Sequence, residues 1–257
     1  MKVLIKFFDF YINSSIHVAF AVFCLLEITI ISNRLNSISN FSICVFFGTV
    51  IGYNFLKYYA VFKSRNYRSN KYYSILAVTF LAVIGFLYSF YYLNFSVQKL
   101  ILISGLLVLI YPFLRKLGWL KLFLVSFVVT FITVYIPFQN SKWLPLEFYT
   151  SIFQRFFILI SLLIPFEIMD IKTDDKSLNT LPQQFGIDST KLFGILVVIP
   201  FIVLEFLKLH PSYLVLPIGI STVTLINFTE LKRNKYYTSF WIESVPIFWW
   251  LLLVLFQ

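Results

Sequence analysis

Long apolar runs, separated by short polar segments, recur along the whole chain. A helix needs about 20 apolar residues to cross the hydrocarbon core of a bilayer, and each run approaches this length. Backbone groups find no water there, so helices are expected, whereas outer-membrane strands would alternate polar and apolar positions. The pattern predicts nine membrane-spanning helices, over residues 14–31, 41–60, 74–93, 98–114, 120–138, 148–168, 192–209, 211–229 and 239–256.

The first residues have a different pattern. Lys2, Lys6, Asp9 and Asn13 recur at helical spacing, with Phe, Leu, Ile and Val between them. This amphipathic pattern predicts a short helix, within residues 1–13, that lies in the membrane interface. A signal peptide is disfavoured because no small-residue cleavage site follows. No linker or low-complexity tract interrupts the chain, so we expect one transmembrane domain over residues 1–257.

Composition supports the membrane interpretation. The chain is 60% hydrophobic and 12% charged, whereas an average soluble domain is about 25% charged. The net charge of +10 does not indicate nucleic acid, because the basic residues lie between apolar runs and no nucleic-acid module is present. Cys24 and Cys44 fall within apolar runs, and neither they nor the isolated His17 and His210 have metal or disulfide spacing. We expect both histidines to be satisfied or interfacial.

The distribution of basic residues predicts the topology. About three quarters of the 21 lysine and arginine residues fall on one side of the nine predicted spans. This asymmetry favours a cytoplasmic N-terminus and a C-terminus on the opposite side. The expected fold is therefore an all-α, polytopic membrane protein, a bundle of nine transmembrane helices. Frequent Asn, Lys, Ile and Phe are typical of an AT-rich genome and point to a bacterial inner membrane.

Carboxylates gather in one short segment. Four of the five aspartates, Asp170, Asp174, Asp175 and Asp188, lie within or just after residues 166–186. Asp170 and Asp174 are four residues apart, which predicts that they share one face of a helix leaving the membrane, with Glu167 one turn earlier. Such oxygen ligands suit Mg²⁺ together with a substrate phosphate. The alternative is an ordinary solvated turn after a helix.

The surrounding residues carry a family resemblance. "DIKTDDKSLNTLPQQFG" resembles the second aspartate-rich motif of the UbiA superfamily, the intramembrane prenyltransferases. A second segment, "LIYPFLRKLGWLKL", looks like the family's Tyr-Pro-x-x-Lys-Arg with the two basic residues in the opposite order, and "KRNKYYTSFWIES" is a weaker match. The matching positions are Asp170, Asp174, Lys176, Thr180-Leu181-Pro182, Phe185-Gly186, Tyr111-Pro112 and Arg115-Lys116.

The resemblance implies transfer of a prenyl group from a prenyl diphosphate to a lipophilic, usually aromatic, acceptor within the membrane. It implies that Asp170 and Asp174 are catalytic and bind magnesium, because the departing diphosphate must be neutralised. The implied contacts to the diphosphate come from Asn54, Arg115, Lys116 and Lys176. For Arg115 and Lys116 the alternative is ordinary positive charge on the cytoplasmic side.

The first aspartate motif of the family is missing. Active members carry Asn-Asp-x-x-Asp-x-x-x-Asp near the end of the second span, where this chain has "GYNFLKYYAVF". Asn54 remains, but Phe55, Tyr58 and Phe62 stand at the aspartate positions. We therefore expect one magnesium ion rather than two, with the Lys57 ammonium as a catalytic point charge in place of the other.

Lys57 and the function both leave alternatives open. Lys57 either reaches the headgroups, bridges to Asp170 or Asp174, or holds the substrate diphosphate. The chain is either a prenyltransferase with an altered site, the favoured reading, or a non-catalytic relative that binds an isoprenoid or a protein partner. A transporter has little support because Glu27, Glu205 and Glu243 are scattered over separate spans.

Overall fold

The computed structural model describes residues 2–36, 39–63, 70–114, 118–139, 146–175 and 178–256, and these are helical with short connections and no strands. The elements are α1 (Lys2–Asn13), α2 (Ile16–Ser32), α3 (Ser39–Lys63), α4 (Asn70–Tyr91), α5 (Phe95–Leu114), α6 (Leu120–Thr130), η2 (Phe131–Tyr135), α7 (Ile136–Phe138), α8 (Leu146–Asp170), α9 (Leu181–Phe185), α10 (Ile187–Glu205), α11 (Val215–Asn227), η4 (Tyr237–Ile242) and α12 (Val245–Phe256).

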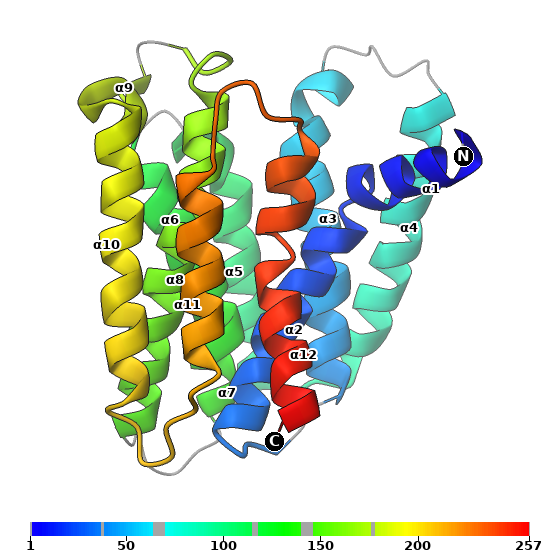
Figure 1. The fold of residues 1–257 in the computed structure, drawn as a ribbon. Coiled ribbons are helices and arrows are strands. Elements are labelled where there is room, and N and C mark those ends of the chain that lie inside the picture. Colours follow the sequence, from blue (N-terminus) through cyan, green and yellow to red (C-terminus); the bar gives the residue numbers. More distant parts are fainter. Residues whose placement is uncertain are drawn as a thin grey trace.

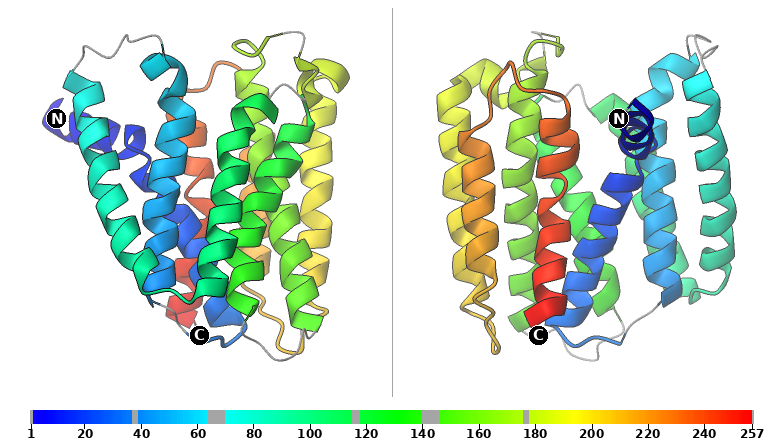
Figure 2. Two further views of the ribbon diagram at one scale, coloured as in Figure 1. Left: turned by 180° about the vertical axis from the view of Figure 1, so that it is seen from behind. Right: turned by 45° about the vertical axis from the view of Figure 1, so that its right-hand side comes forward.

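The long helices stand side by side as an up-and-down bundle, with the two termini at opposite ends (Figure 1). The helix α1 runs across the bundle axis near one end, and the views of Figure 2 agree on this position. It meets α2 at a bend of 58°. Ser15 makes this bend with a positive φ of 61°, a conformation that few residues other than glycine adopt. A helix over the first residues is therefore present, while its place in the membrane interface stays a prediction.

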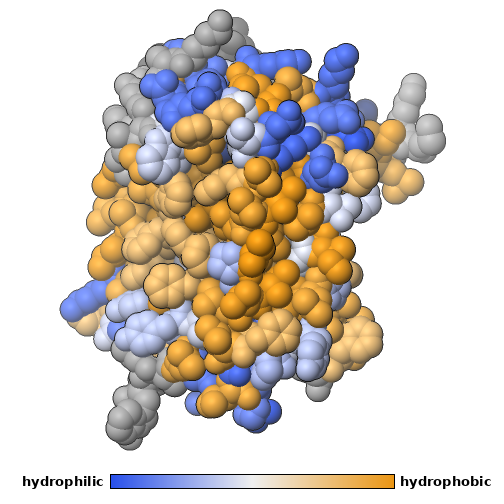
Figure 3. All heavy atoms as spheres, turned by 60° about the vertical axis from the view of Figure 1, so that its left-hand side comes forward, coloured by the Kyte–Doolittle hydropathy of each residue, from blue (hydrophilic) through white to orange (hydrophobic). Residues whose placement is uncertain are grey.

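Apolar helices make this chain an integral, multi-pass membrane protein. Within the described residues, seven helices are long and apolar enough to cross a membrane, and the bent pair α1–α2 makes up to eight. The helix α11 has 13 residues and is shorter than a typical span. Figure 3 shows a broad apolar band between more polar ends. Large apolar side chains such as Leu87, Leu106 and Ile220 are exposed on the outside of the bundle.

Helices occupy all the predicted spans, but several of the predicted ends are wrong. The helix α10 begins at Ile187, before the predicted residue 192, and ends at Glu205 rather than 209. The run 239–256 is not one regular helix, because the π-helical η4 and then residues 243–244 precede α12. Similarly, the run 120–138 contains the π-helical η2. Hydropathy does not register such local changes in helical winding.

The helix α8 occupies the centre of the bundle. In its apolar window 61% of residues are buried, compared with 11% in α5. Its Ile158 and Leu162 belong to the main apolar cluster, together with Phe201, Ile218 and Trp249 from the helices around it. The path of α8 through the core brings its last turn to one end of the bundle, where Glu167 is buried and Asp170 is exposed.

Candidate functional site

The aspartate segment begins where α8 ends. Asp170 is the last residue of that helix, and the backbone amides of Thr173 and Asp174 both donate to its carbonyl oxygen, at 2.9 and 2.8 Å. The chain turns there instead of continuing as a helix. Asp174 consequently becomes buried while Asp170 stays exposed. Asp174 therefore lies beyond the end of the helix, although its N–H still bonds the Asp170 carbonyl at helical spacing.

A buried lysine holds two carboxylates at this end. The Nζ atom of Lys121, in the first turn of α6, lies 3.0 Å from Glu167 Oε1 and 2.9 Å from Asp174 Oδ2. All three residues are buried. The other carboxylate oxygen of Glu167, Oε2, is buried without a hydrogen-bond partner. Lys121 is one of the basic residues that predicted the topology, and it also lies in the family-like segment "LIYPFLRKLGWLKL", but its role at the site was missed.

Both the oxygen and the nitrogen of the Asn54 side-chain amide make hydrogen bonds within the protein. Its Oδ1 accepts from the Ser15 hydroxyl at 2.7 Å, and its Nδ2 donates to the Ser14 carbonyl at 3.1 Å and to Thr79 Oγ1 at 2.9 Å. The residue thus fastens α3 to the α1–α2 bend and to α4. Its predicted contact with a diphosphate would require at least one of these bonds to break.

Lys57 lies one turn further along α3 and is exposed. Its Nζ donates to the carbonyl of Ile12 at 3.4 Å, near the end of α1, and lies 5.7 Å from the centre of the Tyr58 ring. The ammonium also attracts the carboxylate of Glu243 electrostatically. Lys57 therefore faces the junction of α1, α3 and η4, while the bridge to Asp174 described above is made by Lys121.

Tyr53 marks the point where three helices and one turn contribute polar groups. It lies on α3 and interacts electrostatically with Glu243, Tyr111 and Asp170, which belong to the Glu243 turn after η4, to α5 and to α8. We call these four residues the polar centre. Glu243 had been set aside as one of several scattered glutamates. The weaker family-like segment "KRNKYYTSFWIES" contains it and was the available signal.

The segment after the aspartates contains the short helix α9. The backbone N–H of Thr180 donates to Gln183 Oε1 at 3.0 Å, and Leu181-Pro182 open the short helix α9. Proline is favoured in the first turn, where its missing N–H costs nothing. Gly186, with φ 83°, separates α9 from α10. Three predicted diphosphate ligands, Arg115, Lys116 and Lys176, lie outside the described residues.

The residues do not fit the magnesium ion predicted between Asp170 and Asp174. Magnesium demands near-ideal octahedral oxygen ligands at about 2.0–2.1 Å. Here the Asp174 Oδ2 and Glu167 Oε1 atoms already accept from an ammonium group. Throughout the ranges that the structure describes, no group of three His, Cys, Asp or Glu side chains could hold a metal ion. Magnesium thus stays a prediction from the resemblance, without geometric support.

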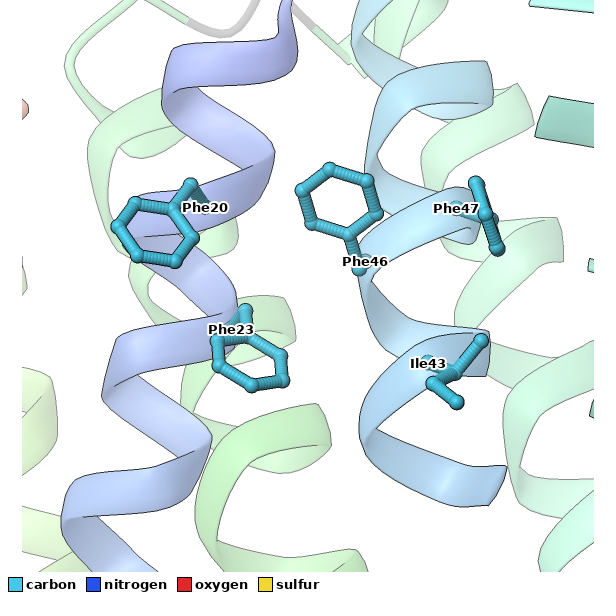
Figure 4. A pocket seen from close by; sticks show the side chains of 5 residues that line it. All are labelled: Phe20, Phe23, Ile43, Phe46 and Phe47. Carbon is cyan, nitrogen blue, oxygen red and sulfur yellow. The ribbon is translucent and has the colours of Figure 1, made fainter. Parts of the chain in front are cut away.

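An apolar pocket opens between α2 and α3. Phe20 and Phe23 on α2 and Ile43, Phe46 and Phe47 on α3 line it (Figure 4), and its volume is about 360 Å³. All five side chains are hydrocarbon, so the pocket suits an apolar chain and offers no hydrogen bond to a polar one. On α3 it begins two turns before Asn54, toward the start of the helix.

Other sequence expectations concerned isolated residues. His17 is buried and satisfied, as expected: Nδ1 lies 3.0 Å from the Tyr11 hydroxyl, and Nε2 lies 3.2 Å from both the Phe240 carbonyl and the Ser244 hydroxyl. Cys24 and Cys44 are buried free cysteines. The histidine therefore fastens α2 to the η4 region, beside the polar centre.

Comparison with known proteins identifies a solved structure with a similar fold. No family model matches the chain, and no curated protein sequence matches it. Among solved structures, the apo structure of a UbiA homolog from Aeropyrum pernix K1 is similar with a TM-score of 0.67 and 14% identity. The likeness covers 93% of this chain and 97% of that one. This chain has the fold of a UbiA homolog. The resemblance noticed in three short segments therefore extends to the whole arrangement of helices.

Proposed function

We propose that this chain binds a prenyl diphosphate at the polar end of the bundle and transfers its prenyl group to a lipophilic acceptor. One observation carries the proposal: in a UbiA-like bundle, Tyr53, Tyr111, Asp170 and Glu243 form a polar centre at the end of the buried helix α8. Beside Asp170, the carboxylates of Glu167 and Asp174 are buried. Buried ionisable groups in a membrane bundle are costly and mark functional sites. The predicted ligands Arg115, Lys116 and Lys176 follow the ends of α5 and of the Asp170 turn in the sequence.

Prenyl transfer would use both the polar end of the bundle and its apolar surroundings. The bond between the prenyl C1 and the diphosphate oxygen breaks, and its electron pair leaves with the diphosphate. An acceptor atom bonds to C1 and gives up one proton to water at the polar end. Basic residues would stabilise the departing charge, and Lys57 at the α1–α3 junction is the described candidate. The surrounding protein keeps water from the cationic carbon.

The apolar pocket between α2 and α3 suits the hydrocarbon tail. A prenyl chain presents no hydrogen-bonding group, and all five lining side chains are apolar. We assign the tail to this side of the bundle, with the diphosphate toward the Asn54 end of α3. A lipid-exposed entrance is consistent with a substrate that is itself dissolved in the membrane.

The topology completes the proposal. Nine crossings, with α11 as a short span, would put the two chain ends on opposite sides, in agreement with their positions in Figure 1. The excess of basic residues in the segments at the α9 end favours a cytoplasmic location for this end. The polar centre would then meet water-soluble diphosphates from the cytoplasm, across an inner membrane.

A non-catalytic isoprenoid-binding protein is the second candidate. It is favoured by the three apolar or aromatic residues at the aspartate positions of the first motif, and by the pairing of Asp174 with Lys121. Such a protein would retain the pocket and the diphosphate site but release no product. The two candidates differ in turnover and agree on binding.

A transfer assay separates them. Membranes containing the protein would receive radiolabelled geranyl, farnesyl or geranylgeranyl diphosphate, with a panel of aromatic and lipophilic acceptors. The proposal predicts a labelled lipophilic product and release of diphosphate, both lost in Asp170→Asn and retained in the control Asp188→Asn, which changes an exposed aspartate in the first turn of α10. Saturable binding without product would support the second candidate, and absence of both binding and product would exclude each of them.

A further inference from the structure

Lys121 stands where a metal would be expected. Its ammonium nitrogen lies 3.0 Å from Glu167 Oε1 and 2.9 Å from Asp174 Oδ2, and the residue is only 6% exposed. A lysine this deeply buried rarely occurs without paired charges. The two carboxylates come from the last turn of α8 and from the segment after it, so a single side chain of α6 joins both parts of the aspartate region.

The backbone around Lys121 is shaped for this contact. Gly118 has a φ of 62°, and a Cβ atom at that position would lie 2.1 Å from the Leu178 carbonyl oxygen and 2.8 Å from that of Asn179. Only glycine allows the turn before α6 to touch the chain that follows the aspartates. The amide of Lys121 then donates to the Gly118 carbonyl at 3.3 Å. The close approach of Gly118 to the Leu178 carbonyl and the ion pairs of Lys121 thus both bring the start of α6 against the aspartate segment.

Electrostatics makes the lysine and a metal ion competitors. A divalent cation at Asp174 would need the oxygen atoms that the ammonium occupies, and the two cations would repel each other in a site with little water. Without any metal, the Lys121 ammonium already compensates part of the negative charge of the two carboxylates. Loss of the lysine would leave two buried carboxylates close together, an arrangement that takes up a cation or a proton.

We propose that Lys121 replaces a divalent cation at Glu167 and Asp174, so that the aspartate segment is ordered and the site operates without metal at these two side chains. This inference deepens the proposed function at the same site. Its test does not require turnover, so absence of prenyl transfer would leave it standing. Removal of the ammonium should convert the pair of carboxylates into a site for Mg²⁺ or Mn²⁺.

The experiment compares thermal unfolding of the purified full chain in detergent, in EDTA and in millimolar MnCl₂ or MgCl₂. For the wild type and the control Lys191→Gln, whose ammonium binds the Asn227 carbonyl on α11 instead, we expect the same midpoint in both conditions. For Lys121→Gln we expect a lower midpoint in EDTA and a rise of about 5 °C or more with metal. Metal shifts of equal size in all three proteins, or none in Lys121→Gln, would overturn the proposal.

A second measurement covers the case in which Lys121→Gln does not fold. Binding of Mn²⁺ to the wild-type protein is followed by loss of the free-ion signal in electron paramagnetic resonance. Absence of saturable binding below about 1 mM, about a hundredfold weaker than even the weakest sensor-type calcium sites, supports the replacement by Lys121. Tight binding that disappears in Asp174→Asn would overturn it, because the carboxylate would then be available to metal despite the lysine.

Discussion

Two clusters of buried charge, at opposite ends of the bundle, have opposite compositions. At the candidate site one cation, Lys121, serves two carboxylates, Glu167 and Asp174. At the other end one carboxylate, Glu205, accepts from Lys208 Nζ at 2.6 Å, from Gln154 Nε2 at 2.7 Å and from a backbone N–H. In the first cluster two carboxylates share one ammonium group, whereas in the second a single carboxylate accepts from three donors.

A buried arginine adds to the positive charge of the second cluster. Arg155 is 3% exposed, donates from Nη2 to Thr29 Oγ1 at 3.0 Å and lies 5.2 Å from the centre of the Trp249 ring. Its Nε and Nη1 atoms are buried without hydrogen-bond partners. A site for a substrate anion needs accessible donors, which this closely packed arginine does not offer. Burial of charge alone therefore does not identify the functional end; accessibility of groups such as Asp170 does.

The largest expected effect comes from removal of the single carboxylate. Glu205→Gln removes the carboxylate that contacts Lys208 and leaves only the weaker attraction of Glu147, which should reduce the free energy of unfolding by about 3–5 kcal/mol. Glu167→Gln leaves Lys121 paired with Asp174, a neutral pair, and should cost less than about 1 kcal/mol. Thermal unfolding of both variants in one detergent measures the contrast. Equal losses of unfolding free energy in Glu205→Gln and Glu167→Gln would contradict this difference between the two clusters.

The next effect concerns the backbone that supports Lys121. Gly118→Ala forces a side chain into a positive-φ position against the Leu178 carbonyl and should cost about 2 kcal/mol or more. Gly105→Ala is the matched control, because nothing lies within 4 Å of an added Cβ there and alanine favours the helix. Unfolding midpoints should fall for the first variant and stay or rise for the second. An unchanged unfolding midpoint for Gly118→Ala would contradict the claim that the turn before α6 requires glycine.

The smallest effect is a pH dependence at the Glu205 cluster. Burial lowers the pKa of Lys208, which follows the end of α10. The folded protein therefore loses this proton at lower pH than the unfolded chain, so stability should rise as the pH increases toward about 10.4, the ordinary lysine value. Unfolding midpoints at pH 8 and 9.5 should show this rise in the wild type and in Lys172→Met, an exposed control, and lose part of it in Lys208→Met. An identical slope in all three would contradict the assignment.

Sequence patterns predicted the helices well because hydrocarbon thickness and backbone hydrogen bonding dictate them directly. They predicted the ends less well: α10 starts at Ile187 because Asp188 and Thr190 are compatible with a first helical turn although they are polar. The partner of Asp174 was beyond sequence reasoning. Lys121 is 53 residues away in the chain, and a positive charge near a span end is explained equally well by topology. Glu243 joined Tyr53 only through the packing of η4 against the bundle.

The central claim is that the polar end of the bundle holds a diphosphate, and a binding measurement tests it most directly. Purified protein in lipid nanodiscs is titrated with farnesyl thiodiphosphate, which resists ionisation of its leaving group, with farnesol and inorganic diphosphate as competitors. We predict saturable binding that inorganic diphosphate displaces, weakened about tenfold, or about 1.4 kcal/mol, in Lys57→Met and unchanged in Lys99→Met, whose ammonium lies over the Phe95 ring. Binding that farnesol matches, that inorganic diphosphate does not displace and that both variants retain would contradict the account.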